Sequence, residues 1–153
     1  MPVTIRTLAP EDISRCNDIN RSLPDWFGLE EGLAEAEEYL RNHAGLVAEM
    51  DGQVIGYLTW TMLFPTSAEI SWMAVAKSHH RHGVGRALIH ALENVQAGTR
   101  LLSVKTLSDS HPSPEYASTR AFYTSMGFQP QMVFPDLWGS SNPCLLMVKI
   151  IAL

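Results

Sequence analysis

The sequence contains very little cysteine and no long uncharged apolar run, and each absence excludes a class of protein. Cys16 and Cys144 are the only two cysteines among 153 residues, and they lie far apart in the sequence. This usage suggests neither a disulfide framework nor a cysteine zinc site, so free thiols are expected. The longest apolar stretch, Cys144–Leu153, is interrupted by Lys149 and is too short to span a bilayer. The first residues lack the apolar region of a signal peptide, so we expect a cytoplasmic protein without a membrane partner.

Positive charge is also scarce. Lys and Arg together number 11 against 16 Asp and Glu, which gives a formal net charge of -5. A surface that coats nucleic acid is basic, so no nucleic-acid partner is expected and cationic partners are favoured. Hydrophobic residues make up 46% and charged residues 18% of the chain, which is typical of globular proteins. We find no repeat, low-complexity tract or linker, and predict a single domain over residues 1–153.

Hydrophobic periodicity predicts strands that alternate with amphipathic helices. The predicted strands are Val3–Leu8, Leu46–Met50, Gln53–Trp60, Glu69–Val75, Leu101–Thr106, Phe128–Phe134 and Cys144–Ile150. The predicted helices are residues 10–20, 29–42, 84–95 and 116–126, with a loop over Ser22–Gly28. Asp51-Gly52 suits a two-residue hairpin turn, and Gly127 suits the left-handed end of a helix. This order implies a mixed α/β fold, in which a sheet of about seven strands is flanked by about four helices and contains one parallel crossover.

A glycine pair, Gly83-Val84-Gly85, opens a helix directly after a strand. Successive backbone N–H groups at such a position can converge on a phosphate, and the helix dipole favours its negative charge. The segment lacks the third glycine of the dinucleotide fingerprint and the Lys-Ser/Thr of a Walker loop, which excludes both of those sites. From residue 70 to residue 92 the only formal charges are those of Lys77, Arg81 and Arg86. This local charge of +3 strengthens the interpretation as a phosphate site.

Three histidines, His79, His80 and His82, lie in the same loop and are candidate metal ligands. They are nearly contiguous, and no Asp or Glu lies nearby to complete a ligand set. We therefore expect no metal.

Two segments resemble the GNAT superfamily of acetyl-CoA-dependent N-acetyltransferases. His80–Leu88 is similar to its pyrophosphate signature, which is usually Arg or Gln, two variable residues, Gly, one variable residue, and Gly or Ala. His80 stands in place of the Arg or Gln. Thr119–Phe128 resembles the late helix of the family, which ends in Tyr, three residues and Gly-Phe, with Tyr123 at the Tyr position. Tyr116 stands where many members carry an Asn that contacts CoA. With the element order, the resemblance covers nearly the whole chain.

The resemblance implies acetyl-CoA as cosubstrate. It also implies a splayed sheet, in which the strand ending at Val75 parts from the strand Leu101–Thr106 and the pantetheine arm lies in the cleft. The residues that it assigns to the cofactor are Met73, Ala74 and Val75 along the pantetheine arm, Arg81, His82, Gly83, Val84, Gly85 and Arg86 around the pyrophosphate, and Tyr116.

Acetyl transfer from a thioester to an amine needs an unprotonated amine, a stabilised oxyanion and a proton for the departing thiolate. Glu69 stands where several family members hold a catalytic Glu and is the candidate base. The alternatives are that Glu69 is only a surface carboxylate and that an ordered water acts as the base. A backbone N–H at residues 73–74 is expected to polarise the carbonyl. Tyr123 matches the general acid of the family. A phenol of pKa about 10 is protonated at neutral pH and can therefore return a proton to the sulfur. Packing beneath the cleft is its alternative, with Tyr116 and His111 as fallback donors.

Acidic and aromatic residues suggest the acceptor. The segment from Asp25 to Glu38 carries six carboxylates and no Lys or Arg, which would concentrate a cationic amine, although such runs also form solvated faces. Trp26, Phe27 and Trp138 are candidate walls of a small acceptor pocket, or caps of the core. We therefore predict direct acetyl transfer, through a ternary complex, to a small cationic primary amine. A protein acetyltransferase acting on Lys or N-termini, a non-catalytic CoA sensor and a homodimer stay open.

Overall fold

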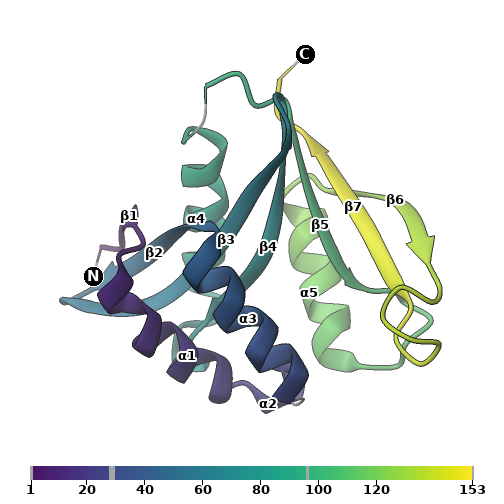
Figure 1. The fold of residues 1–153 in the computed structure, drawn as a ribbon, viewed down its shortest axis with the longest axis horizontal. Helices are drawn as coiled ribbons and strands as arrows, with labels where there is room; N and C mark the ends of the chain where they lie inside the picture. The colour runs from purple at the N-terminus through teal and green to yellow at the C-terminus, as the bar shows by residue number, and fades with distance from the viewer. Residues whose placement is uncertain (1, 28–29, 96, 153) are drawn as a thin grey trace. The chain divides into compact units, whose positions relative to one another are not determined.

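The computed structural model describes residues 2–27, 30–95 and 97–152. Seven strands form a sheet in the order β1-β2-β3-β4-β5-β7-β6, and five α-helices accompany them within these ranges (Figure 1). The strands are β1 (Thr4–Thr7), β2 (Ala44–Met50), β3 (Gln53–Phe64), β4 (Ser67–Val75), β5 (Leu101–Leu107), β6 (Gln129–Phe134) and β7 (Cys144–Ile150). The helices are α1 (Ile13–Arg21), α2 (Pro24–Phe27), α3 (Glu30–Asn42), α4 (Val84–Glu93) and α5 (Pro114–Ser125). β4 and β5 are parallel, so the predicted mixed sheet is confirmed.

The prediction of a loop over Ser22–Gly28 is wrong at Pro24–Phe27, which form the helix α2, and Gly28 lies outside the described residues. Pro24 begins the helix and Asp25 lies in its first turn, and both residues favour a helix start. The N–H of Phe27 donates to the carbonyl of Leu23 at 2.9 Å. A helix of one turn carries no hydrophobic periodicity, which is why the sequence pattern does not predict it. Leu29, the predicted start of the next helix, also lies outside the described residues.

The structure divides into two compact units, each described by itself. The first unit comprises Met1–Thr61 with Ser71–Ala97, and the second comprises Met62–Ile70 with Gly98–Leu153. β4 contributes to both, because its first residues, Ser67–Ile70, pair with Leu101–Val104 of β5 and its remaining residues belong to the first unit. The prediction of a single domain stays a prediction.

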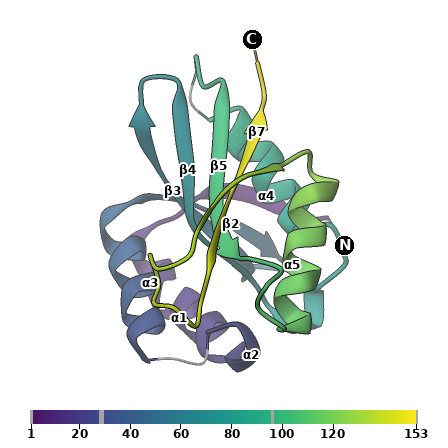
Figure 2. The same ribbon diagram turned by 90° about the vertical axis from the view of Figure 1, so that its right-hand side faces the viewer.

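Neighbouring residues of β3 place helices on both faces of the sheet in the first unit. Tyr57 is fully buried, and its hydroxyl donates to Oδ1 of Asn20 in α1 at 2.8 Å. A Cβ on the preceding residue, Gly56, would lie 3.1 Å from the side chain of Val84 in α4. Because successive strand residues point to opposite faces, α1 and α4 cover opposite sides of β3, as Figures 1 and 2 show. Glycine at position 56 allows the close approach of α4.

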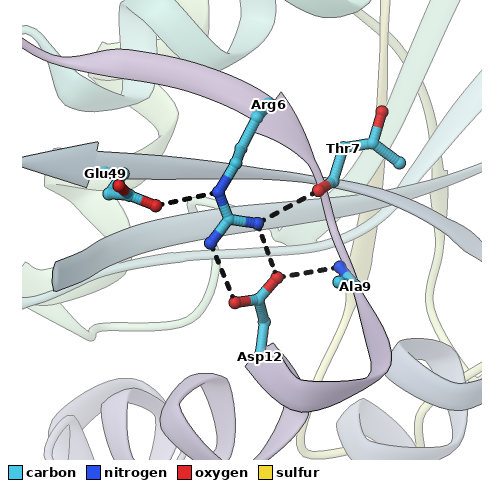
Figure 3. Close-up of polar contacts among 5 residues, drawn as sticks. All are labelled: Arg6, Thr7, Ala9, Asp12 and Glu49. Carbon is cyan, nitrogen blue, oxygen red and sulfur yellow. Dashed lines mark hydrogen bonds and ion pairs between the residues drawn. The ribbon is translucent and has the colours of Figure 1, made fainter. Parts of the chain in front are cut away.

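An arginine on β1 ties the start of the chain to β2 (Figure 3). The two terminal nitrogens of Arg6 bond both carboxylate oxygens of Asp12 at 2.8 and 3.0 Å, and its Nε donates to Glu49 at 2.8 Å. Asp12 also accepts the N–H of Ala9 at 2.8 Å. The hydrogen bonds from Arg6 hold the pKa of Asp12 below its usual value. This buried carboxylate therefore fixes the path of the chain from β1 into α1.

In the second unit, α5 begins and ends with complete caps. The hydroxyl of Ser113 accepts the N–H of Tyr116 at 3.2 Å, ahead of Pro114 in the first turn. At the other end, the N–H of Phe128 donates to the carbonyl of Tyr123, and that of Gly127 to Thr124, both at 3.0 Å. Gly127 has a φ of 96°, the left-handed conformation that this helix end requires. The predicted helix end at Gly127 is confirmed.

Candidate active site

A loop in the first unit connects β4 to α4 and contains the predicted phosphate site. Arg81 and Gly83 both adopt left-handed backbone conformations, with φ of 65° and 80°, and Gly83 is the N-cap residue of α4. The N–H of Ala87 donates to the carbonyl of Gly83 at 3.0 Å and makes the first backbone bond of the helix. Among the described residues, no hydrogen bond is donated by the backbone N–H groups of residues 81–86. Six successive N–H groups at a helix start therefore lie available to an anion.

The side chains around this loop add positive charge. Lys77, Arg81 and Arg86 are exposed, and none of the ion pairs in the described ranges involves them. A Cβ on Gly83 would meet no atom within 4 Å, so open space adjoins the N-cap. Unpaired N–H groups, unpaired cations and free space together suit an anion such as a pyrophosphate.

His80, the residue that replaces the Arg or Gln of the family signature, makes contacts that the sequence does not predict. Its Nε2 lies 2.7 Å from the carbonyl oxygen of Val75, the last residue of β4. Its ring also meets the ring of Trp26 from α2 edge-on, with centroids 5.5 Å apart and an interplanar angle of 87°. His80 thereby joins the end of β4, the loop between β4 and α4, and α2.

The three residues assigned to the pantetheine arm lie in the last part of β4. Ala74 is buried in the core of the first unit, whereas Met73 and Val75 are half-buried. The N–H of Ala76 donates to the carbonyl of Ile55 at 2.8 Å and fixes the end of this strand on β3. Their role toward acetyl-CoA stays a prediction.

Glu69, the candidate base, forms an ion pair in the second unit. Its Oε2 accepts from Nζ of Lys105 at 2.8 Å, and the side chains of Glu69 and Lys105 are 16% and 34% exposed. Glu69 pairs with Ser103 across the parallel strands, and Lys105 lies two residues further along the same face of β5. The ammonium ion of Lys105 thus contacts one of the two carboxylate oxygens of Glu69.

Tyr123, the candidate acid, is 5% exposed and lies on the last turn of α5. Burial raises its pKa above the ordinary range, and the nearby Tyr116 adds to the effect. Within the described residues, its hydroxyl makes no hydrogen bond. Its ring contacts that of Phe128 at a centroid distance of 5.4 Å. The phenol of Tyr123 is therefore protonated at neutral pH. Its ring is fixed by packing, and its hydroxyl has no hydrogen-bond partner among the described residues.

The two fallback donors lie at the start of the same helix. Burial raises the pKa of Tyr116 to about 12. Nδ1 of His111 accepts the N–H of Ser113 at 3.2 Å, so this nitrogen is not the protonated one.

The three aromatic residues predicted for the acceptor have different surroundings. Trp26 contacts His80, as described above, and Phe27 packs on Trp72 of β4 with ring centroids 4.8 Å apart. Trp138 belongs to the second unit, follows β6 and is 41% exposed. Their role toward an acceptor stays a prediction.

Sequence reasoning misses a chain of polar contacts in the first unit that joins His43, Ser71 of β4 and Thr59 of β3. Oγ of Ser71 lies 2.8 Å from Nδ1 of His43 and 2.8 Å from Oγ1 of the fully buried Thr59. The ring of Tyr39 in α3 contacts the rings of both His43 and Trp72, the residue that follows Ser71. Residues 28 and 12 positions apart carry no local signal that would have predicted these pairs.

Neither a metal centre nor a membrane span is found in the described ranges. Their His, Cys, Asp and Glu side chains form no group of three that would bind a metal ion. No helix there has both the length and the hydropathy that crossing a membrane demands.

Comparison with known proteins gives a family for this site. The model of the acetyltransferase (GNAT) domain matches residues 41–130, which is more than half of the chain. An uncharacterized N-acetyltransferase of Methanocaldococcus jannaschii is 30% identical over 103 residues, which cover 67% of this chain and 64% of that protein. The match thus spans less than two thirds of the relative's length. The chain belongs to the GNAT acetyltransferase family.

Solved structures agree on the fold. A GNAT-family protein of Desulfovibrio desulfuricans superimposes with a TM-score of 0.84 at 23% identity, over 99% of this chain and 100% of that one. The ribosomal-protein-S18-alanine N-acetyltransferase of Escherichia coli gives 0.76 at 18% identity, over 99% and 96%. An aminoglycoside 6'-N-acetyltransferase, solved with coenzyme A, gives 0.74 at 18% identity, over 100% and 98%. The GNAT fold predicted from the sequence is thereby confirmed.

Proposed function

We propose that this protein transfers an acetyl group from acetyl-CoA to a primary amine, directly and within a ternary complex. The observation that carries the proposal is the run of six unbonded backbone N–H groups at residues 81–86, in a chain of the GNAT family. Such groups would bind the two phosphates of the pyrophosphate without reorganisation, and the exposed cations Lys77, Arg81 and Arg86 would neutralise its charge.

The chemistry divides among a few groups. The amine loses its proton to the carboxylate of Glu69, directly or through a water, and its lone pair attacks the carbonyl carbon of the thioester. A backbone N–H at residues 73–74 stabilises the oxyanion. When the tetrahedral intermediate collapses, the C–S bond breaks and the phenol of Tyr123 gives its proton to the sulfur, while the second proton of the attacking nitrogen passes to the phenolate or to water, which leaves a neutral amide. The raised pKa of Tyr123 keeps this phenol protonated at neutral pH.

A small cationic amine is the acceptor that the charge distribution favours. Asp25, Glu30, Glu31, Glu35 and Glu38 are all exposed on α2 and α3. The carboxylates attract a cation, and the aromatic rings of the same unit bind one by cation–π contact. Two of the structurally similar proteins act on acceptors of different kinds, an aminoglycoside and an alanine of a ribosomal protein. A protein acceptor is therefore the second candidate, and a CoA sensor without turnover is the third.

The test is a screen of amines that follows the release of CoA from acetyl-CoA. Small polyamines and aminoglycosides form one arm, and peptides with a free N-terminus or internal lysines form the other. Turnover in the first arm supports the proposal, and turnover confined to the second reassigns the acceptor. If acetyl-CoA binds in calorimetry but no acceptor turns over, the sensor hypothesis takes its place.

A further inference from the structure

We propose that His80 is a positioning residue, which couples α2 to the acetyl-CoA loop through its two side-chain contacts. The inference rests on the proposed function, because it assigns a role in binding the same cosubstrate. It makes acetyl-CoA affinity depend on Trp26, a residue that sequence reasoning assigns to the acceptor pocket or to a cap of the core.

The first contact fixes the shape of the loop. A carbonyl oxygen is only an acceptor, so the 2.7 Å contact requires that Nε2 of His80 carries a hydrogen and donates it to Val75. This bond closes the turn between the end of β4 and the residue just before the unbonded N–H groups. Arg81, the next residue, is held at a φ of 65°, a conformation that a residue other than glycine rarely adopts. The hydrogen bond of His80 supplies the restraint that this strained neighbour needs.

The same argument accounts for the departure from the family signature. Arg and Gln, the usual residues at this position, carry side-chain N–H donors, and so does the Nε2–H form of His. The donor is therefore retained although the residue type differs. A side chain without a donor would leave the carbonyl of Val75 without this bond.

The second contact links the loop to α2. The ring of Trp26 meets the imidazole ring edge-on, and the backbone N–H of Trp26 donates to the carbonyl of Leu23 at 3.1 Å within the turn that begins α2. Phe27, the next residue, packs on Trp72, so α2 is held at both aromatic side chains. An acetyl-CoA molecule that orders residues 81–86 would order α2 through His80. By thermodynamic reciprocity, loosening α2 must then weaken acetyl-CoA binding.

The experiment measures acetyl-CoA affinity by calorimetry for the wild type, His80→Ala, His80→Gln, Trp26→Ala and the double alanine variant. His80→Ala should weaken binding by about tenfold, the usual effect of one lost interaction of this kind, and His80→Gln should restore it to within about threefold of the wild type. Trp26→Ala should weaken binding by roughly three- to tenfold, and the double variant should bind no worse than His80→Ala alone, because the two residues act in series. His79→Ala removes the neighbouring histidine, whose Nδ1 lies 2.9 Å from Oγ of Ser78, and as the matched control it should bind like the wild type.

Kinetics and spectroscopy separate positioning from a general loss of structure. His80→Ala should raise the KM for acetyl-CoA about as much as it weakens binding, with kcat changed by no more than about twofold. Nitrogen NMR of the wild type should show the hydrogen of His80 on Nε2. Equal affinity of His80→Ala and the wild type would overturn the inference, as would a His80→Gln variant as weak as His80→Ala or a strictly additive double variant. Failure of the wild type to bind acetyl-CoA would instead overturn the proposed function.

Discussion

The ammonium ion of Lys105 lies 2.8 Å from the carboxylate of Glu69, across the parallel strands β4 and β5. Glu69 therefore has two candidate roles, as the base of the reaction or as one half of an ion pair that stabilises the pairing of the two strands. Glu69→Gln should lower kcat/KM by roughly ten- to a thousandfold if the carboxylate takes the proton, while acetyl-CoA affinity is preserved. Steady-state rates and calorimetry on the same preparation measure both quantities.

Lys105→Met provides the matched control for this pair. It removes the ion pair but keeps the carboxylate, so most of the activity should remain if Glu69 is the base. If Glu69→Gln and Lys105→Met lose the same stability, and each loses activity only in proportion to its loss of folded protein, the ion pair has a structural role and another group takes the proton.

Gly83→Val should abolish acetyl-CoA binding. A β-branched residue at a φ of 80° is strained, so the backbone of the loop would move and its N–H groups would no longer converge on the pyrophosphate. Gly52→Val is a matched control, since Gly52 has a φ of 78° in the hairpin between β2 and β3, where a Cβ also meets no atom within 4 Å. Calorimetry should show wild-type affinity for the control alone. Unchanged affinity in Gly83→Val would remove the loop from the cofactor site.

Tyr123→Phe should lower kcat by roughly tenfold to ten-thousandfold with nearly intact acetyl-CoA affinity. The ring packing on Phe128 is kept, and the hydroxyl makes no hydrogen bond among the described residues, so the melting temperature should hardly change. A variant with wild-type kcat would leave Tyr123 as a packing residue and transfer the role to Tyr116.

The alkaline limb of the wild-type profile offers a second test of Tyr123. The protonated phenol is the active form, and burial raises its pKa above the ordinary value of about 10. Ionisation of Tyr123 should therefore not lower kcat near pH 10, and activity should persist to higher pH than an exposed tyrosine would allow. A fall in kcat centred below pH 10 that vanishes in Tyr123→Phe would contradict the raised pKa.

Asp12→Asn should lower the free energy of unfolding by about 1 to 2 kcal/mol at neutral pH, because it removes a charged hydrogen-bond acceptor of Arg6. The pKa of Asp12 is lowered in the folded state, so its stabilisation is fully present above the ordinary Asp value of about 4. It is lost as the pH falls through the lower folded-state value. Urea unfolding at neutral and acidic pH should show the wild type and the variant converging in acid.

Local chemistry explains why much of the fold is predictable. Asp51 and Gly52 adopt φ values of 52° and 78° in the predicted hairpin, and Gly127 adopts 96° at the predicted helix end. Each of these conformations depends on the residue itself, so the sequence signals it directly. The single-turn α2 was missed, since four residues give no periodic pattern.

The sequence by itself determined which segments form strands and the later helices along the chain, the glycine-rich start of α4, and the family. Each of these signals comes from residues that are close neighbours in the sequence. Only the tertiary structure decided which side chains meet. Lys105 reaches Glu69 from 36 positions away, and Trp26 reaches His80 from 54. Such contacts depend on how strands and helices pack, and no local pattern of residue types encodes them. The partners of Glu69 and His80, and hence what each residue can do, therefore emerged only from the folded chain.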